Sequence, residues 1–139
     1  RVVSLARYLD RPQIVRSSEG FRLYIQSNDW WGEPPATMLG RIMLQNLTQR
    51  LPGTTLFAEN GAVSSLPDAI LGIAIQRMDL DQAGALRLLA QISVARRQPI
   101  ARNVSLSETP SGAGTLALVA AMSAAIGGLS DQAATMLTA

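Results

Sequence analysis

The sequence predicts an α/β protein, a single-domain sandwich over residues 1–139 in which two main helices cover a mixed, partly antiparallel sheet of about five or six strands. Three observations carry this prediction. Several segments alternate apolar and polar residues, as strands with one buried face do. Two other segments repeat apolar residues every three or four positions, as amphipathic helices do. No internal repeat, low-complexity tract or linker divides the chain.

The N-terminal segments predict short strands separated by a charged corner. Extended pieces are expected at Val2–Leu5 and Gln13–Ser17, because Pro12 between them has no N–H and cannot sit inside a central strand. Phe21–Ser27 alternates cleanly, and Ser18–Gly20 before it is a good turn, so this segment is expected to form a hairpin with Gln13–Ser17. The sequence NDWWGEPP is then expected to end the strand.

A helix is predicted to open at Pro34 and Pro35, where a missing N–H is tolerated, and to end at the LPG of residues 51–53. Its apolar residues form one stripe: Met38, Leu39, Ile42, Met43, Leu47 and Leu51. Residues 54–59 are predicted to form a short strand, and residues 60–67 a polar loop.

Three long strands are predicted next, as an antiparallel meander. Residues 69–80 carry apolar residues on both parities, which favours a strand covered on both faces. Residues 84–97 alternate instead, and residues 99–108 follow a turn at Arg97–Pro99. The inward residues expected in the middle strand are Leu86, Leu88, Ala90, Ile92 and Val94.

The last element is predicted to be a helix from about Ala113 to Leu137. Gly127 and Gly128 lie in its middle, where each costs about 1 kcal/mol relative to alanine, so a kink or a close packing contact is expected there. Residues 116–129 come nearest to a membrane span, but we expect them to be too short and too rich in Ala, Ser and Gly. The predicted buried stripe is Val119, Met122, Ile126, Leu129, Ala133 and Met136.

Composition excludes several classes of site. The chain has no cysteine and no histidine, which removes disulfides, zinc–thiolate sites, cysteine nucleophiles and the usual Ser-His-Asp triad. All twelve basic residues are arginines and are scattered, so no nucleic-acid partner is expected. We therefore predict no catalytic residue, cofactor or metal, although spacing alone does not exclude an acid–base pair of carboxylates. The chain starts at Arg1 without methionine, so we expect any targeting signal to lie upstream.

For two polar motifs we prefer an interpretation that involves no bound ligand. Asp79 and Asp81 lie on one side of a predicted strand and could share a cation, with Glu108 as a third ligand. A hard cation needs six or more oxygen ligands, so two solvated carboxylates near a turn are the favoured interpretation. The SGAGT of residues 111–115 lacks the lysine and spacing of a phosphate-binding loop and is interpreted as a helix entry.

The pair Trp30–Trp31 is the most informative aromatic feature. Adjacent residues cannot both point inward in a simple turn, so one indole is expected to be partly exposed, as partner anchors often are. The alternative, which we favour, is that one ring staples the helix start onto the sheet while the other lies flat over it.

A combination of motifs resembles a known family. YLDRPQIV at residues 8–15 is followed by an alternating strand, by Trp31, Glu33 and Pro34, and by the helix end NLTQRLPG at residues 46–53. With the terminal helix, these resemble the ABC-type transport auxiliary lipoprotein family, the PqiC-like group of Gram-negative envelope proteins. Ala6–Arg7 stand where that family often has Pro-Glu. The block at residues 8–15 is the more specific part.

The resemblance implies a non-enzymatic accessory subunit on the periplasmic side of the outer membrane, held by an upstream lipid anchor. It implies an MCE-domain protein and an ABC permease–ATPase pair as partners in moving lipids or other hydrophobic molecules, with a contribution to membrane integrity. A homo-oligomer is also expected. The alternatives are a stand-alone periplasmic carrier of a lipid or small ligand and a cryptic hydrolase.

The corner at residues 8–12 and the two tryptophans are the candidate family-motif or docking residues: Tyr8, Asp10, Arg11, Pro12, Trp30 and Trp31. Tyr8 and Leu9 are expected to pack inward near the helix start, with Trp31 closing the same pocket. Asp10 and Arg11 are expected to pair with each other or to cap backbone groups, and Arg11 is assigned to docking.

Overall fold

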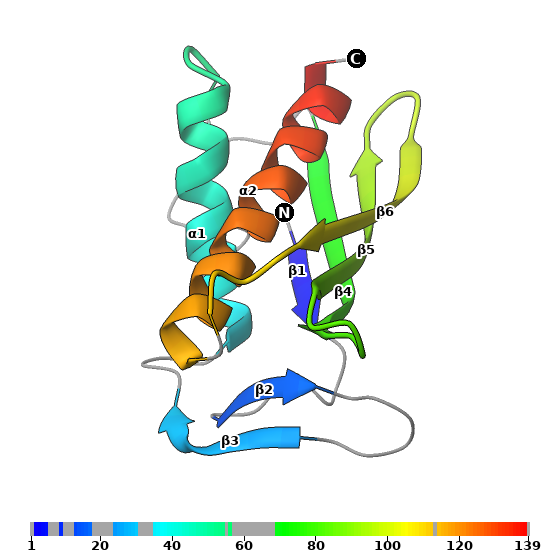
Figure 1. The fold of residues 1–139 in the computed structure, drawn as a ribbon. Coiled ribbons are helices and arrows are strands. Elements are labelled where there is room, and N and C mark those ends of the chain that lie inside the picture. Colours follow the sequence, from blue (N-terminus) through cyan, green and yellow to red (C-terminus); the bar gives the residue numbers. More distant parts are fainter. Residues whose placement is uncertain are drawn as a thin grey trace.

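The computed structural model describes residues 2–5, 9, 13–17, 24–30, 35–54, 56, 69–112 and 114–138, with side chains for residue 9 and for those from 35 onward. The elements run along the chain as shown in Figure 1. They are β1 (Val2–Leu5), β2 (Gln13–Ser17), β3 (Tyr24–Trp30), α1 (Pro35–Arg50), β4 (Ile70–Leu80), β5 (Leu86–Ala95), β6 (Ile100–Glu108) and α2 (Thr115–Thr138).

The sheet has the order β3-β2-β4-β5-β6 within the described residues, with β1 also beside β4. β1 runs parallel to β4 along residues 72–75, and β2 meets the same strand further on, where Ser17 is opposite Leu80. The chain therefore follows one edge of β4 twice, and residues 6–12 join the two passages. The two extended pieces predicted at Val2–Leu5 and Gln13–Ser17 are confirmed.

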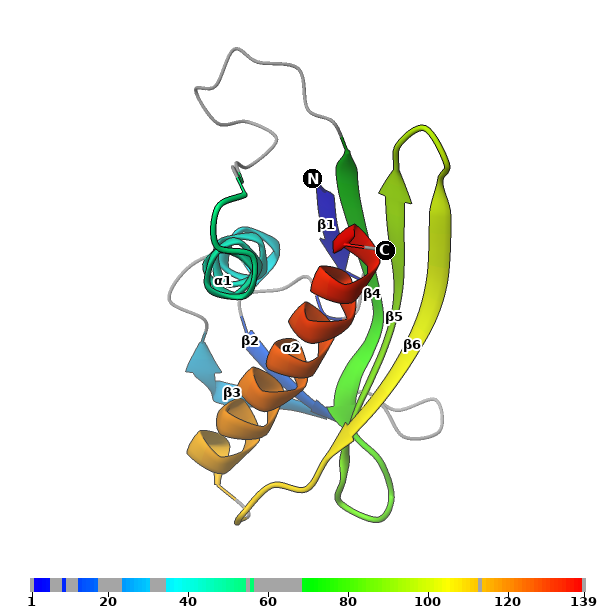
Figure 2. The ribbon, with the colours of Figure 1, turned by 90° about the horizontal axis from the view of Figure 1, so that it is seen from above.

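The antiparallel meander of β4, β5 and β6 is also confirmed. β5 alternates without exception: its five inward side chains are buried and the five between them are exposed. Both helices lie on one side of this meander, and α2 crosses it diagonally (Figures 1 and 2). The core lies between these layers, and its completely buried large side chains include Met43, Leu47, Leu88, Ile92 and Leu129.

The expectation that β4 is covered on both faces was wrong for the first part of the strand, although Met78, Asp79 and Leu80 at its end are all buried. A β-bulge accounts for the apolar residues on both parities. Leu71, Ile73 and Ile75 are buried, whereas Ile70 on the opposite parity is 45% exposed. The register with β5 shifts between Ile75 and Arg77, after which Met78 is opposite Leu88. One extra residue moves the following side chains to the other parity. Apolar residues on both parities therefore face the same helices.

α2 confirms the predicted C-terminal helix and runs without a break through its glycines. A Cβ added at Gly128 would lie 3.3 Å from Leu106 Cδ1, so this glycine allows the helix to approach β6 closely. By length and composition alone α2 could cross a membrane, which corrects the expectation that the segment is too short. Its buried stripe faces the sheet and α1, as in a core helix.

Other boundaries differ from the prediction. β3 continues through Asn28 and Asp29 to Trp30, where we expected the strand to have ended. Thr54 and Leu56 are not in a strand, and the rest of the strand predicted at residues 54–59 lies outside the described residues, as does the loop at 60–67. The α/β class with two helices is confirmed. The strand count for the whole chain stays a prediction, because much of the chain before β4 lies outside the described residues.

Candidate functional site

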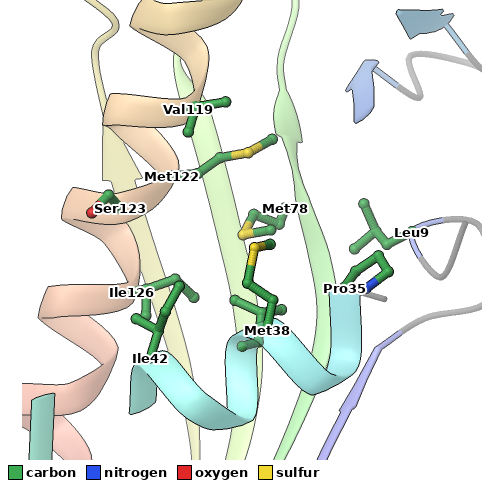
Figure 3. Close-up of a pocket in the computed structure, with 10 residues that line it drawn as sticks. Leu9, Pro35, Met38, Ile42, Met78, Val119, Met122, Ser123 and Ile126 are labelled. Carbon is green, nitrogen blue, oxygen red and sulfur yellow. The ribbon is translucent and has the colours of Figure 1, made fainter. Parts of the chain in front are cut away.

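An apolar pocket of about 180 Å³ lies between the first turns of α1, the first half of α2 and strand β4 (Figure 3). The β2–β3 ribbon lies at this same end of the molecule, where both helices begin (Figures 1 and 2). The described lining residues are Leu9, Pro35, Met38, Leu39, Ile42, Met78, Val119, Met122, Ser123 and Ile126. Ser123 is the only one of these ten with a polar side chain.

The lining divides into a buried floor and a more open rim. Leu39, Met78 and Ile126 are each at most 5% exposed and form part of the floor. Met38 and Val119 at the rim are only half-buried, and Ser123 is exposed. Since protein interiors are packed with few voids larger than a water molecule, a cavity of this volume between two core helices is an unusual feature.

Leu9 and Pro35 bring the sequence motifs to the pocket. Leu9 belongs to the YLDRP corner and is 5% exposed, and Pro35 begins α1 directly after the WGEP step. Both line the same cavity, so the predicted inward packing of Leu9 near the helix start is confirmed. Tyr8 and Trp31, which we expected to share this pocket, lie outside the described residues.

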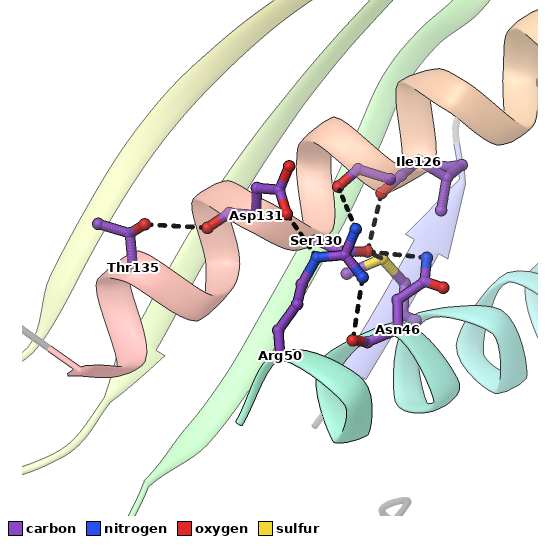
Figure 4. A network of polar contacts seen from close by, with 8 residues as sticks. Asn46, Arg50, Ile126, Ser130, Asp131 and Thr135 are labelled. Carbon is purple, nitrogen blue, oxygen red and sulfur yellow. Dashed lines mark hydrogen bonds and ion pairs between the residues drawn. The ribbon is translucent and has the colours of Figure 1, made fainter. Parts of the chain in front are cut away.

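A second, polar contact joins the two helices beyond the pocket (Figure 4). Ser130 is fully buried on α2 and donates to the carbonyl oxygen of Ile126 at 2.8 Å. Its oxygen accepts a bond from Asn46 Nδ2 of α1 at 3.1 Å and lies 3.3 Å from Met43 Sδ. Because buried polar groups must be paired, this hydroxyl fixes how Asn46 approaches α2.

Arg50 completes the polar contact at the end of α1. Its Nε donates to Asp131 Oδ1 at 2.5 Å, and its two terminal nitrogens donate to the carbonyl oxygens of Asn46 and Gly127 at 3.1 and 3.4 Å. The guanidinium thus binds the C-terminal turn of α1 to the middle of α2. We use "polar contact" for the residues Asn46, Arg50, Gly127, Ser130 and Asp131.

Comparison with known proteins identifies the family. A family model described as the ABC-type transport auxiliary lipoprotein component matches residues 1–134. The chain belongs to this family. No curated protein matches the sequence.

Two solved structures share the fold. A crystal structure of an uncharacterized protein has a TM-score of 0.86 at 20% identity, over 98% of this chain and 88% of the other. The crystal structure of protein XCC0632 from Xanthomonas campestris, described under the family DUF330, has a TM-score of 0.71 at 20% identity, over 94% of this chain and 76% of the other.

Family membership confirms the resemblance seen in the sequence, and the structure explains one of its motifs. In NLTQRLPG, Asn46 and Arg50 form the polar contact, while Leu47 is fully buried and Leu51 is 8% exposed. Gly53 has a φ of +85°, which suits glycine in the turn after the helix. The motif therefore fixes α1 against the rest of this auxiliary lipoprotein domain.

Asp79 was wrongly interpreted as a solvated carboxylate. It is fully buried, and its Oδ1 accepts a bond from Arg77 Nε at 2.6 Å. Asp79 lies next to Leu80, which is paired with Ser17 of β2. Among the described residues no group of three or more His, Cys, Asp or Glu side chains comes together.

Asp81 has a different role, in the turn between β4 and β5. Its Oδ1 accepts bonds from the N–H groups of Ala83 and Ala85 at 2.9 and 3.0 Å, and its Oδ2 lies 3.1 Å from Arg87 Nε. The bond from Ala85 N–H is the main cause that lowers the pKa of Asp81 below its ordinary value, with smaller contributions from Ala83 and Arg87. Gly84, at a φ of +82°, completes the turn.

Most of the remaining candidate residues are not among those that the structure describes. Tyr8, Asp10, Arg11, Pro12 and Trp31 lie outside the described residues, and Trp30 is placed only as the last residue of β3. Their assignment to docking stays a prediction. The sequence predicted a pocket near the start of α1, but it did not predict the walls that α2 and β4 contribute, although Met38, Ile42 and Val119 were correctly placed on the inward stripes of their helices.

Proposed function

We propose that this protein is a non-enzymatic accessory subunit of an envelope transport system, on the periplasmic side of the outer membrane of a Gram-negative bacterium. The observation that carries the proposal is membership of the ABC-type transport auxiliary lipoprotein family over residues 1–134. An upstream lipid anchor holds the protein at the membrane. Its partners are an MCE-domain protein and an ABC permease–ATPase pair that move lipids or other hydrophobic molecules and so contribute to membrane integrity.

The absence of histidine and cysteine from the sequence supports a role without catalysis, because histidine is the commonest general base and cysteine is one of the common nucleophiles. In this proposal the protein acts by binding. Purified protein is expected to show no turnover of ester or phosphoester substrates. Turnover that persists through repeated purification would contradict the proposal.

Partner binding is the main test. The lipidated full-length protein should co-purify with the MCE-domain protein of the same system, and its deletion should sensitise cells to detergent. A matched pair of variants probes the docking residues: Arg11→Ala is expected to weaken co-purification, whereas Arg97→Ala, exposed in the turn between β5 and β6, should leave it unchanged. Equal retention of both variants would assign docking elsewhere, and absence of the wild-type complex would contradict the proposed partnership.

Self-association is part of the same proposal. β6 ends the described sheet, and no strand pairs with its outer edge within the described residues. An open strand edge is a template for pairing with another chain. Sedimentation of the mature protein at micromolar concentration is expected to show a homo-oligomer, and only monomer would contradict this.

A stand-alone carrier of a lipid or small ligand is the second candidate, and the apolar pocket is the observation that favours it. Native mass spectrometry distinguishes the two roles. A carrier would retain about one ligand per chain without any protein partner, whereas the accessory role requires the partner complex.

A further inference from the structure

We propose that the apolar pocket binds one unbranched alkyl chain, such as the acyl tail of a lipid. The proposal goes beyond the accessory role, because it concerns a ligand of this chain itself and holds whether or not the protein docks on a transporter. It rests on three properties of the described lining: its chemistry, its shape and its methionines.

The chemistry of the lining selects an occupant without polar groups. Nine of the ten described lining side chains are apolar, and the exception, Ser123, lies at the exposed rim. A polar ligand would lose its hydrogen bonds to water here and find few replacements. A peptide segment would face the same loss at every residue, because each residue carries an N–H and a C=O. An alkyl chain has no polar groups, so it loses no hydrogen bonds to water when it enters the pocket.

The apolar surface that continues beyond the cavity favours a linear chain over a compact ring. The volume of about 180 Å³ alone would also suit a compact ligand, because apolar cavities of about 150 Å³ stay dry and take up benzene or xenon. Val119 continues the lining along α2, and Leu116, one turn earlier on the same helix face, is 88% exposed. From Leu116 to Ile126 the helix rises about 15 Å, and Leu116 extends the apolar face by about one turn beyond Val119 at the cavity rim.

The methionines allow the pocket to adapt to a flexible occupant. Met38 comes from α1, Met78 from β4 and Met122 from α2, so each wall contributes one, and Figure 3 shows all three around the same space. Methionine is unbranched and polarisable and adjusts easily to the shape of an apolar ligand. The polar contact further along the helices holds α1 and α2 together, so the pocket can change at its rim without separating them.

The first test blocks the rim. The probe is dansyl-labelled undecanoic acid, titrated by fluorescence into the purified protein. Ser123→Trp places a large ring at the mouth and is expected to weaken binding by about tenfold or more. Ala124→Trp is the matched control, because Ala124 is the next residue of α2, is exposed and does not line the pocket. It should bind like wild type. Equal affinities for the two variants would overturn the proposal.

The second test uses ligands without a charged head group and measures how affinity depends on the length of the alkyl chain. Neutral straight-chain 1-alkanols from butanol to decanol compete with the probe. Each added methylene should improve competition by about fourfold until the pocket is full. Affinity independent of chain length, or failure of the wild type to bind the probe, would overturn the proposal.

Thermal unfolding and partner co-purification complete the design. Both tryptophan variants should unfold within about 2 °C of wild type, so that a change in binding is not a change in folding. If Ser123→Trp abolishes partner co-purification while wild type binds no alkyl probe, the pocket holds a partner's side chain and the proposal is wrong. If alkyl binding is found without any partner complex, this proposal stands and the accessory role fails.

Discussion

The two helices meet in two different ways along one line of contact. At the polar contact, a buried hydroxyl and a guanidinium with three hydrogen-bond acceptors join them directly. At the apolar pocket, the same helices leave a cavity between them, which is lined by Met38, Val119 and their neighbours. The two regions are only a few turns apart on each helix.

The difference shows how this fold can keep an unfilled space. Directional bonds cross between the helices at the polar contact, so the helices are held together there regardless of what fills the pocket. The pocket has no polar network to preserve. Stability is therefore expected to be concentrated at the polar contact and its core neighbours, whereas the pocket can tolerate substitution and bind a ligand.

The largest expected effect is a difference in unfolding free energy between substitutions of two methionines on α1. Met43 is fully buried beside Ser130, and Met38 is half-buried at the pocket rim. Met43→Ala should lower the free energy of unfolding by about 2–5 kcal/mol, because it opens a cavity in a packed core. Met38→Ala should cost about 1 kcal/mol or less, since that side chain already faces empty space. Urea denaturation of both variants measures the difference, and equal losses would remove the distinction between the two regions.

The next effect concerns the buried hydroxyl of the polar contact. Ser130→Ala removes the acceptor for Asn46 and should cost about 1–2 kcal/mol of unfolding free energy. Thr135→Ala is the control on the same helix, because its hydroxyl is exposed and bonds only to the Asp131 carbonyl, so a change within about 0.5 kcal/mol is expected. A double-mutant cycle with Asn46→Ala should show coupling of about 0.5 kcal/mol or more. Strictly additive losses would mean that the bond does not join the helices.

A smaller effect distinguishes the partners of the ion pair. Asp131 has a side chain 67% exposed, so Asp131→Ala should cost about 0.5 kcal/mol or less. Arg50→Ala should cost about 1 kcal/mol, because it also removes the bonds to the carbonyls of Asn46 and Gly127. Added salt should weaken the first contribution more than the second. Thermal unfolding at low and high salt tests this, and a larger loss from Asp131→Ala would reverse the assignment.

Patterns within one element could be predicted from the sequence. The alternation of β5 identified all five inward residues, because burial on one face of a strand leaves a period of two. The stripe of α1 was likewise correct for Leu39, Met43 and Leu47. The same period-two reasoning gave a wrong prediction for most of β4, because a bulge after Ile75 changes the parity of the inward residues. Only the pairing with β5 reveals this bulge.

Contacts between distant segments could not be predicted. Asn46 and Ser130 are 84 residues apart, and no period in the sequence relates them. The sequence placed Leu9 at a pocket near the start of α1, but it did not predict that the space between the helices stays open. A helical stripe predicts which residues face inward and does not show whether another element fills the space between them. Met38, Ile42 and Val119 face inward as expected, yet they remain half-buried around a cavity. Asp79 was expected to be solvated because it lies near a turn, whereas its side chain is fully buried in the structure.

The smallest expected effect lies in the turn between β4 and β5, where backbone N–H groups contribute more than the Arg87 side chain to holding the Asp81 carboxylate. The pKa of Asp81 is lowered from its ordinary value of 3.8, mainly by the N–H of Ala85. The folded state therefore favours the ionised form. The contribution of Asp81 to stability is complete above about pH 5 and is lost as pH falls through the ordinary pKa and then through the folded pKa.

Asp81→Asn should reduce this loss of stability at acid pH while changing stability at pH 7 only slightly. Arg87→Gln, which removes only the ion pair, should flatten it less, because Ala85 N–H is the larger cause. Thermal midpoints of the two variants and wild type between pH 2 and pH 7 test this order. Equal flattening by both variants would mean that the guanidinium, and not the backbone, holds the turn between β4 and β5.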